Sequence, residues 1–388
     1  MNLLKQKIEN LSTLGIGDYD KNFQDERVKR FSEYQDDVAI RLSLNHLIKI
    51  YEKSGFLYPE KKSRIEPYID LILDNWQAAL KLDDQLLCVI KFKGKSPKKE
   101  QLTSISFWRS TYNSWVAQHL VSTGFPVGVC AMMLKAQAEV NIEKHRYKSF
   151  QNWFSKSNGY ANLIFGTLVK TIGKTNSRVT LFSYMGVKDI SKLFSQKIII
   201  SDYQNDMQQE LYEFYCRIRG KIDAEAEEMN DQDMELEQLD QLYQQVGLRR
   251  KRYVWIASIK HQTKIAGAAI VYRGPFGLNF SLIENRCDLL IDPLLSIRER
   301  EIICHNLLSE ASKAYFKYDL GLLFPIQYFP VVTDANTAEI IINAGGFFLR
   351  EYNKSIWMQQ AFEGWYQHIQ VQYDSFLKQL KQKRQLNK

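Results

Sequence analysis

The stretch ANTAEIIINAGGFFLREYNKSIWMQ, residues 335–359, carries the pattern that decides the fold of this 388-residue chain. Its first part, 336–345, has the apolar spacing of a short helix, and that helix ends at a glycine. Its second part, 347–359, predicts a strand or a hairpin. The sequence therefore predicts a helix that passes through a Gly-Phe step into a final strand.

The segments before this stretch predict a regular order of elements. We expect two helices, three consecutive antiparallel strands, a long helix and one more strand ahead of the closing helix and strand. In chain order these are a strand at 197–203, helices at 205–220 and 233–246, strands in RYVWIASI, KIAGAAIVYRG and FSLIENRCDLLID, a helix at 296–317 and a strand in LGLLFPI (320–326).

The first half of the chain predicts the same order, although no amino-acid repeat is visible between the halves. Helices are expected at 36–54 and 64–81, strands at 86–92, 104–111 and 114–122, an apolar helix at 129–140, an aromatic segment after it, a helix at 158–172 and a strand at 178–185. The length alone also favours two domains. We therefore predict an N-terminal domain over 1–190, a second domain over 191–362 and a C-terminal helix over 363–388.

This element order resembles that of the acetyl-CoA-dependent N-acetyltransferase (GNAT) superfamily. Asn336, Ala338, Gly346 and Phe347 stand where that family has an Asn, an Ala and a Gly-Phe leading into its last strand. The resemblance implies an α/β (α+β) fold of two tandem acyl-CoA N-acyltransferase-like domains, each with a mixed, mostly antiparallel sheet flanked by helices. It also implies acetyl-CoA or another acyl-CoA as cofactor and acyl transfer to an amine as the reaction.

The second half departs from the family pattern at both places that carry chemistry. The family binds the cofactor pyrophosphate with a Gly-rich loop, but the corresponding segment here, DPLLSIRER (292–300), contains no glycine. The family's general-acid tyrosine falls on Ile342, which cannot transfer a proton. Glu284 is then the best candidate for a catalytic base, and the alternative is a structural ion pair of Glu284 with Arg286.

The first half keeps a candidate phosphate loop at the end of a predicted strand. Ser122, Thr123, Gly124 and Gly128 precede the apolar helix, and two hydroxyls with two glycines at a helix start present O–H and N–H donors to an anion. The spacing is not that of a P-loop, because no Lys-Ser/Thr ends it. The alternative is an ordinary Gly/Pro turn.

Three further residues are predicted to bind the cofactor. Arg109 and His119 lie on the strands that lead into the loop. Asn158 is implied by the resemblance, since Asn158, Ala161 and Phe165 loosely match the family's closing motif in the first half.

Charge is distributed unevenly along the chain. The net charge is +8, and residues 85–178 hold 14 basic and 3 acidic side chains, so this one stretch accounts for the surplus. A basic region of a folded domain often meets phosphates, although a solvated surface explains it equally well. By contrast, 223–240 has nine acids and no base, which we interpret as a solvated helix face or a mobile surface link.

Several other classes of protein are disfavoured. No apolar run is long enough to span a bilayer, and the N-terminal residues lack the pattern of a secretory signal. The five cysteines are odd in number and without CxxC spacing, and the histidines form no HxxxH or HExxH pattern, which argues against a disulfide framework and a metal site. These features predict a cytoplasmic protein.

The sequence leaves two functions open. The first is a tandem N-acetyltransferase-like protein that binds acyl-CoA or a related nucleotide-containing small molecule and transfers an acyl group to an amine. The second is a catalytically inactive ligand-binding or regulatory protein on the same fold, with a protein partner. Aromatic and basic residues interleave over 107–115 and 145–160, but we expect most of these rings in the core, so nucleic acid is the least favoured partner.

Overall fold

The computed structural model describes residues 28–34, 36–93, 101–124, 147–261, 264–318 and 323–386. The chain forms two compact units. The first unit comprises Met1–Arg109, Trp115–Tyr147 and Gln359–Lys388, and the second comprises Ser110–Ser114 and Lys148–Met358. Each unit is an α/β assembly of helices on a largely antiparallel sheet, which confirms the predicted fold class.

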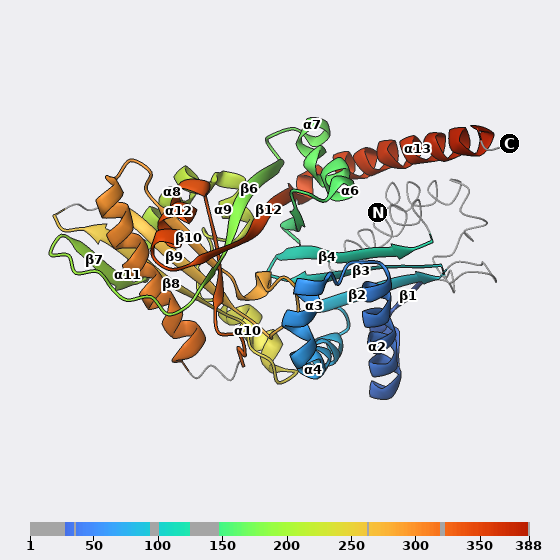
Figure 1. Ribbon diagram of the computed structural model, residues 1–388, viewed down its shortest axis with the longest axis horizontal. Coiled ribbons are helices and arrows are strands. Elements are labelled where there is room, and N and C mark those ends of the chain that lie inside the picture. Colours follow the sequence, from blue (N-terminus) through green and yellow to red (C-terminus); the bar gives the residue numbers. More distant parts are fainter. Residues whose placement is uncertain are drawn as a thin grey trace. The chain divides into compact units, whose positions relative to one another are not determined.

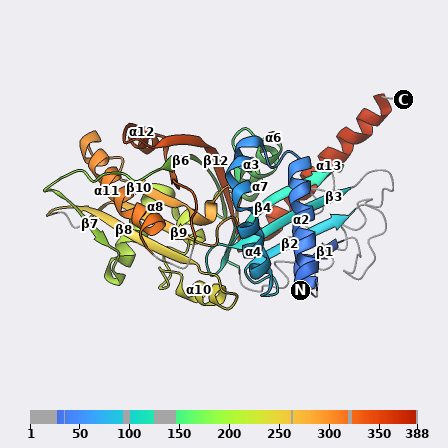
Figure 2. The ribbon, with the colours of Figure 1, turned by 60° about the horizontal axis from the view of Figure 1, so that its bottom comes forward.

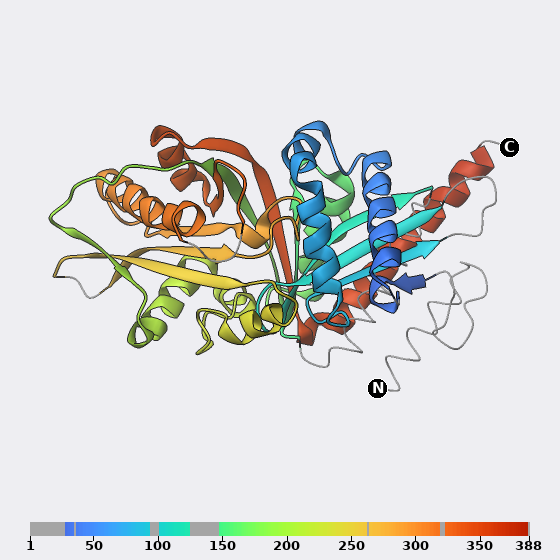
Figure 3. The ribbon, with the colours of Figure 1, turned by 90° about the horizontal axis from the view of Figure 1, so that it is seen from below.

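The sheet of the first unit has the order β1-β2-β3-β4 and is antiparallel throughout. Helices α2 and α4 lie on one face of these strands and α13 lies on the opposite side (Figures 1 and 3). The strands are β1 (Val28–Arg30), β2 (Leu87–Lys93), β3 (Leu102–Arg109) and β4 (Ser114–Thr123), and the helices are α2 (Asp37–Lys53), α3 (Pro59–Ile65), α4 (Ile69–Leu80) and α13 (Phe362–Leu386).

The helices of the first unit form where the apolar spacing predicts them. The carboxylate of Asp36 caps α2 by accepting from the Ala39 N–H at 2.7 Å, and the apolar stripe of α2 is buried. The expected second helix, 64–81, is divided, because a 3₁₀ turn that contains Pro67 separates α3 from α4. The helix expected at 129–140 lies outside the described residues.

The sheet of the second unit has the order β5-β12-β6-β11-β10-β9-β8-β7. Only the β10–β11 pair is parallel. The strands are β5 (Ser149–Ser155), β6 (Ser177–Val187), β7 (Ile198–Asp202), β8 (Lys251–Ile259), β9 (Ile265–Arg273), β10 (Cys287–Ile291), β11 (Phe329–Thr333) and β12 (Phe347–Met358).

Helices cover both faces of this sheet, as Figures 1 and 3 show. α11 (Ile297–Phe316) and α12 (Ala335–Asn343) pack against each other on one face, while α8 (Gln208–Arg219), α9 (Lys221–Ala226) and α10 (Glu237–Gln244) lie on the other. Every residue of β9 is buried in consequence. The short helices α6 (Gly159–Ala161) and α7 (Leu168–Ile172), joined by a π-helical turn, connect β5 to β6.

The last strand of each half is exchanged with the other half. β12, which ends the second half, pairs with β5 of the first half and with β6. β6, which ends the first half, pairs with β11 of the second half. This exchange places 148–187 in the same compact unit as the second half, so the units divide the chain differently from the predicted boundary at 190, which stays a prediction.

One predicted strand is wrong. The strand expected at 320–326 is not formed by its described residues, 323–326, and β11 lies further along the chain at Phe329–Thr333. LGLLFPI is the more apolar segment, with five Leu, Phe or Ile residues of seven, whereas FPVVT has three Phe or Val residues of five. FPVVT is chosen because it fits between β10 and β6 with all five residues buried, and only those neighbours distinguish it from LGLLFPI.

No helix among the described residues is both long and apolar enough to cross a membrane.

The closing motif needs glycine at position 346, because there is no room for a side chain there. A Cβ atom at this position would press against the Ile341 side chain and lie 3.0 Å from the Ile341 carbonyl oxygen and 3.3 Å from that of Gly186. Because two of these atoms are main chain, α12 and β6 cannot easily yield. We expect Gly346→Ala to lower the free energy of unfolding by about 1–3 kcal/mol in urea titrations.

Gly159→Ala is the matched control, because a Cβ there meets nothing within 4 Å. Its unfolding midpoint should stay close to that of the natural protein. Equal midpoints for the two variants would contradict the packing account of the Gly-Phe step.

Candidate functional site

The predicted phosphate loop begins where β4 ends. The Ser122 hydroxyl lies 3.0 Å from that of Thr103, and the Thr123 hydroxyl donates to the Leu102 carbonyl at 3.3 Å and accepts from the Leu102 N–H at 3.2 Å. Both hydroxyls are therefore already engaged with β3. Gly124 has φ +79°, a left-handed conformation that favours glycine, and Gly128 lies outside the described residues.

His119 lies in the core of the first unit. Its ring stacks on Trp76 at 5.4 Å between centroids and also contacts Tyr51 and Phe56. Burial, together with the charge of Lys61, holds the pKa of His119 well below its ordinary value, so the ring is neutral. Its backbone has φ +52° where the β3–β4 pairing is irregular. A buried neutral imidazole supplies no positive charge to a phosphate.

The other two predicted binding residues lie in different units. Arg109, at the end of β3, places its guanidinium over the Trp115 ring at 5.9 Å in the first unit. Asn158 belongs to the second unit and caps α6, its side-chain oxygen accepting from the Ala161 N–H at 3.1 Å. The capping oxygen of Asn158 is thus used by its own helix.

Glu284 is fully buried in the 3₁₀ turn that precedes β10. Its carboxylate accepts from the Gly277 N–H at 2.8 Å, which fixes the loop between β9 and this turn. Burial raises the pKa of Glu284 to about 7, although main-chain hydrogen bonds and the charge of Arg250 oppose the shift. The side chain combines the pKa of a general base with no access to solvent, and it does not pair with Arg286.

The start of α11, within the glycine-free segment 292–300, is capped by the chain itself. The Ser296 hydroxyl accepts from the Glu299 N–H, and the Glu299 carboxylate accepts from the Ser296 N–H at 3.0 Å. This capping box satisfies two helix N–H donors and places a negative charge at the helix start. A bound phosphate would have to displace Glu299.

A cluster of buried charges lies beneath α9 in the second unit and is centred on Glu227. The two carboxylate oxygens of Glu227 lie 2.8 Å from the guanidinium of Arg286 and 2.7 Å from the ammonium of Lys354, and Tyr272 donates a hydrogen bond at 2.9 Å. All four side chains are buried. Burial alone would raise the pKa of Glu227, but the two cations outweigh it and hold the pKa below its usual range.

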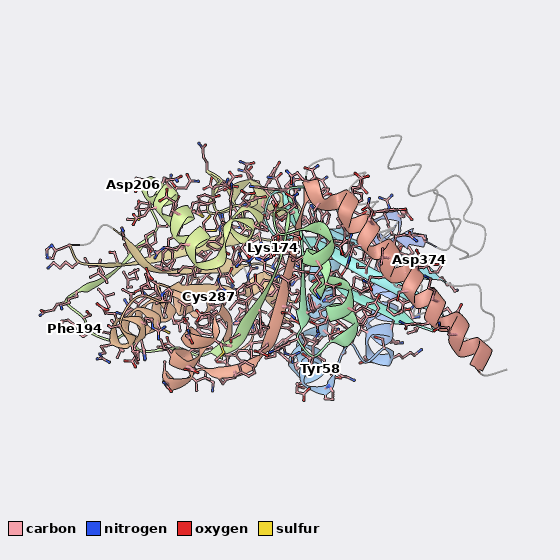
Figure 4. The ribbon with its side chains drawn as sticks, turned by 90° about the horizontal axis from the view of Figure 1, so that it is seen from above. Tyr58, Lys174, Phe194, Asp206, Cys287 and Asp374 are labelled. Atoms are coloured by element: carbon pink, nitrogen blue, oxygen red, sulfur yellow. The ribbon has the colours of Figure 1, made fainter. Side chains whose placement is uncertain are left out.

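Further ion pairs extend this cluster over the sheet. Asp288 of β10 pairs with Arg286 at 3.0 Å, and Asp223 of α9 pairs with Lys354 at 3.1 Å and with Arg178 of β6 at 3.2 Å. Cys287, labelled in Figure 4, lies between Arg286 and Asp288 in the chain. The three carboxylates and three cations balance in charge, so the cluster is suited to holding strands together rather than to binding a charged ligand.

The interpretation of 223–240 as a solvated or mobile acidic stretch is wrong for four of its nine acids. Asp223, Glu227, Glu228 and Asp240 are buried, whereas Glu235 and Glu237 are exposed. Asp240 accepts from the guanidinium of Arg249 at 2.9 Å and from the Arg250 N–H at 2.8 Å, while Glu228 accepts from the Asn113 N–H at 2.6 Å. The buried acids face cations and N–H groups that lie elsewhere in the sequence.

Lys354 and Arg286 are not predictable from the sequence as partners of this acidic stretch. Both stand in or beside strongly apolar strands, NKSIWM and ENRCDLLI. A charged residue at an inward position of such a strand requires a buried counter-charge. That signal was present, but it does not name the partner.

The described residues contain no group of three or more His, Cys, Asp or Glu side chains that could hold a metal ion.

Comparisons with known proteins concern the fold. No family model and no curated protein matches the sequence. Among solved structures, the chain is similar to a tandem GNAT protein from the clavulanic acid biosynthesis pathway (9% identity, TM-score 0.37, covering 74% of this chain and 87% of that one). It is also similar to a putative acetyltransferase from Pyrococcus horikoshii (10% identity, TM-score 0.41, 88% and 93%) and to a GNAT-family acetyltransferase from Colwellia psychrerythraea (10%, 0.31, 70% and 85%).

Glu227 provides the test of the buried cluster. Glu227→Gln keeps the shape of the side chain but leaves Arg286 and Lys354 without their shared counter-charge. We expect a loss of about 3–5 kcal/mol in the free energy of unfolding, measured by urea titration at neutral pH. Combining Glu227→Gln with Lys354→Met should recover part of this loss, because the cluster then again holds equal numbers of carboxylates and cations.

Glu237→Gln, at an exposed position of the same acidic stretch, is the control and should change stability by less than about 0.5 kcal/mol. If Glu227→Gln proved as mild as Glu237→Gln, the cluster would not hold the second unit together.

Proposed function

We propose that this chain binds acyl-CoA or a related nucleotide-containing ligand through its first half, at the end of β4, and that the start of α11 in its second half does not hold the pyrophosphate of this ligand. The main support for this difference between the halves is the capping of α11. Ser296 and Glu299 cap the start of this helix and place a carboxylate where a pyrophosphate would bind. The segment is also without glycine, so the main chain cannot approach a phosphate closely.

The end of β4 offers what the start of α11 lacks. Gly124 adopts a left-handed conformation directly after two hydroxyl residues, and it lies within the basic stretch 85–178. Ser122 and Thr123 bond to β3, so they would support the loop, and main-chain N–H groups would be the donors to a phosphate.

A thermal-shift series tests this proposal. We expect acetyl-CoA and CoA to raise the melting temperature of the natural protein, since a ligand that binds only the folded state stabilises it by mass action. Gly124→Asp should abolish the shift, because a carboxylate and a strained side chain would occupy the phosphate position.

Gly55→Asp is the matched control. Gly55 lies in the same unit and has φ +74°, and a Cβ atom at this position would meet nothing within 4 Å, so the substitution reproduces the strain and the charge away from the loop. Its ligand shift should remain. A natural protein that is not stabilised by acetyl-CoA, CoA or any nucleotide would refute the proposed binding.

Acyl transfer to an amine is the second candidate function, and the pKa of Glu284 favours it. A carboxylate with a pKa of about 7 is well matched to accept a proton from an ammonium group at neutral pH. The freed amine would attack the thioester carbonyl, the C–S bond would break, and CoA would leave as the thiolate. Because Glu284 is fully buried, this reaction requires the loop between β9 and β10 to open.

The same pKa predicts a pH dependence of stability. The carboxyl of Glu284 binds its proton more tightly in the folded chain than in the unfolded chain. Its contribution to the free energy of unfolding is therefore complete below the ordinary pKa of 4.5 and is lost as the pH rises through about 7. Between pH 5 and 8 the free energy of unfolding of the natural protein should fall by up to about 3 kcal/mol relative to that of Glu284→Gln, measured by urea titration at each pH. Parallel curves for the two proteins would show that Glu284 is ionised throughout.

Turnover separates the two candidate functions. A base at Glu284 requires that Glu284→Gln lower kcat for amine acetylation by about a hundredfold or more with an unchanged acetyl-CoA thermal shift. An unchanged rate would leave Glu284 as a loop-fixing residue, and no acetylation by the natural protein would leave the ligand-binding function alone.

A further inference from the structure

Two lysines face each other at the edge of the first unit's sheet. Lys29 of β1 and Lys91 of β2 are directly opposite in the antiparallel register. Opposite residues of such a pair project their side chains from the same face, so two like charges there destabilise the sheet. Figure 2 shows β1 and β2 beside α2, the helix that covers this face.

Both ammonium groups lie against one tyrosine ring. The Nζ atom of Lys29 is 4.1 Å from the centroid of Tyr34, and that of Lys91 is 5.2 Å from the same ring and 5.3 Å from Phe31. The aromatic faces offset part of the repulsion. Neither ammonium forms an ion pair with a carboxylate of the described residues. Arg30, the neighbour of Lys29 in β1, does pair with two carboxylates, Glu33 at 3.0 Å and Asp84 at 3.3 Å.

Hydroxyl groups complete the arrangement. Burial would raise the pKa of Tyr34, but hydrogen bonds from Lys91 and from Ser43 of α2, with the charges of Lys91 and Lys29, lower it below its ordinary value. Lys29 of β1, Lys91 of β2 and Ser43 of α2 thus each contact Tyr34, which is half-buried between β1 and α2.

We propose that Lys29, Lys91, Tyr34 and Ser43 form a binding site for a phosphate group. Two lysine point charges with two hydroxyl donors match the charge and hydrogen-bonding capacity of a phosphate. A bound phosphate would remove the like-charge repulsion that the register of β1 and β2 carries. This site is separate from Gly124, and its donors come from side chains rather than from main-chain N–H groups.

Pyrophosphate binding tests the site directly. We expect inorganic pyrophosphate to bind the natural protein in isothermal titration at an ionic strength held constant with sodium chloride. Lys29→Met/Lys91→Met should weaken binding by at least about tenfold, since each charged hydrogen bond is worth a factor of this order. Lys49→Met, an exposed lysine of α2, is the control and should leave the affinity unchanged. All of these variants are compared in the Gly124→Asp background, so that the loop at the end of β4 does not contribute to pyrophosphate binding.

Tyr34 reports occupancy independently of affinity. With tyrosine labelled at the ring carbon that bears the hydroxyl, and the resonance assigned by Tyr34→Phe, pyrophosphate should raise the pKa of Tyr34, because a bound anion opposes the phenolate. ADP that binds at least about tenfold more tightly than pyrophosphate identifies a nucleotide as the carrier of the phosphate, and equal affinity identifies the phosphate alone. A Tyr34 pKa that does not respond to pyrophosphate, or an affinity that survives Lys29→Met/Lys91→Met, would overturn the proposal.

Discussion

The carboxylate of Glu227 is the group on which the second unit depends. It is buried between Arg286, which precedes β10, and Lys354 of β12. Glu227 directly follows α9 in the chain. β12 ends the second half but pairs with β5 and β6 of the first half. A charge pair of this kind contributes little as net stabilisation, but it is costly to break, because the remaining partners are buried charges. It therefore favours one register for the exchanged strands.

The two halves, which exchange their final strands, differ in how far their polar groups are already bonded within the chain. The second half contains β9, which is buried along its whole length, α11, which is capped by its own side chains, and most of the buried charge cluster. In α11 and in the cluster, the polar groups that could contact a ligand are bonded to other groups of the chain. The first half keeps a left-handed glycine at the end of β4 and a pair of facing lysines at the edge of its sheet. Both binding sites that we propose therefore lie in the first half.

The order of helices and strands could be predicted from the sequence because it depends on local periodicity. The stripe of α2 and the run of β8, β9 and β10 are visible without knowledge of the fold. β11 could not be placed, since LGLLFPI is the more apolar segment and only the flanking strands select FPVVT. The burial of the acidic stretch could not be predicted for a related reason: Arg286 and Lys354 lie about 60 and 130 residues away in the sequence, and composition carries no information on such pairings. The position of His119 in the sequence, close to the loop, suggests a binding role. Its burial could not be predicted, because the rings that surround it, Tyr51 of α2 and Trp76 of α4, come from distant parts of the sequence.

Hydrogen–deuterium exchange with and without acetyl-CoA tests the division of labour between the halves most directly. The account predicts that saturating acetyl-CoA slows exchange of the amides around Gly124, at the end of β4, and leaves the amides of Ser296–Glu299 at the start of α11 unchanged. Slower exchange at the start of α11, with none at the end of β4, would contradict it.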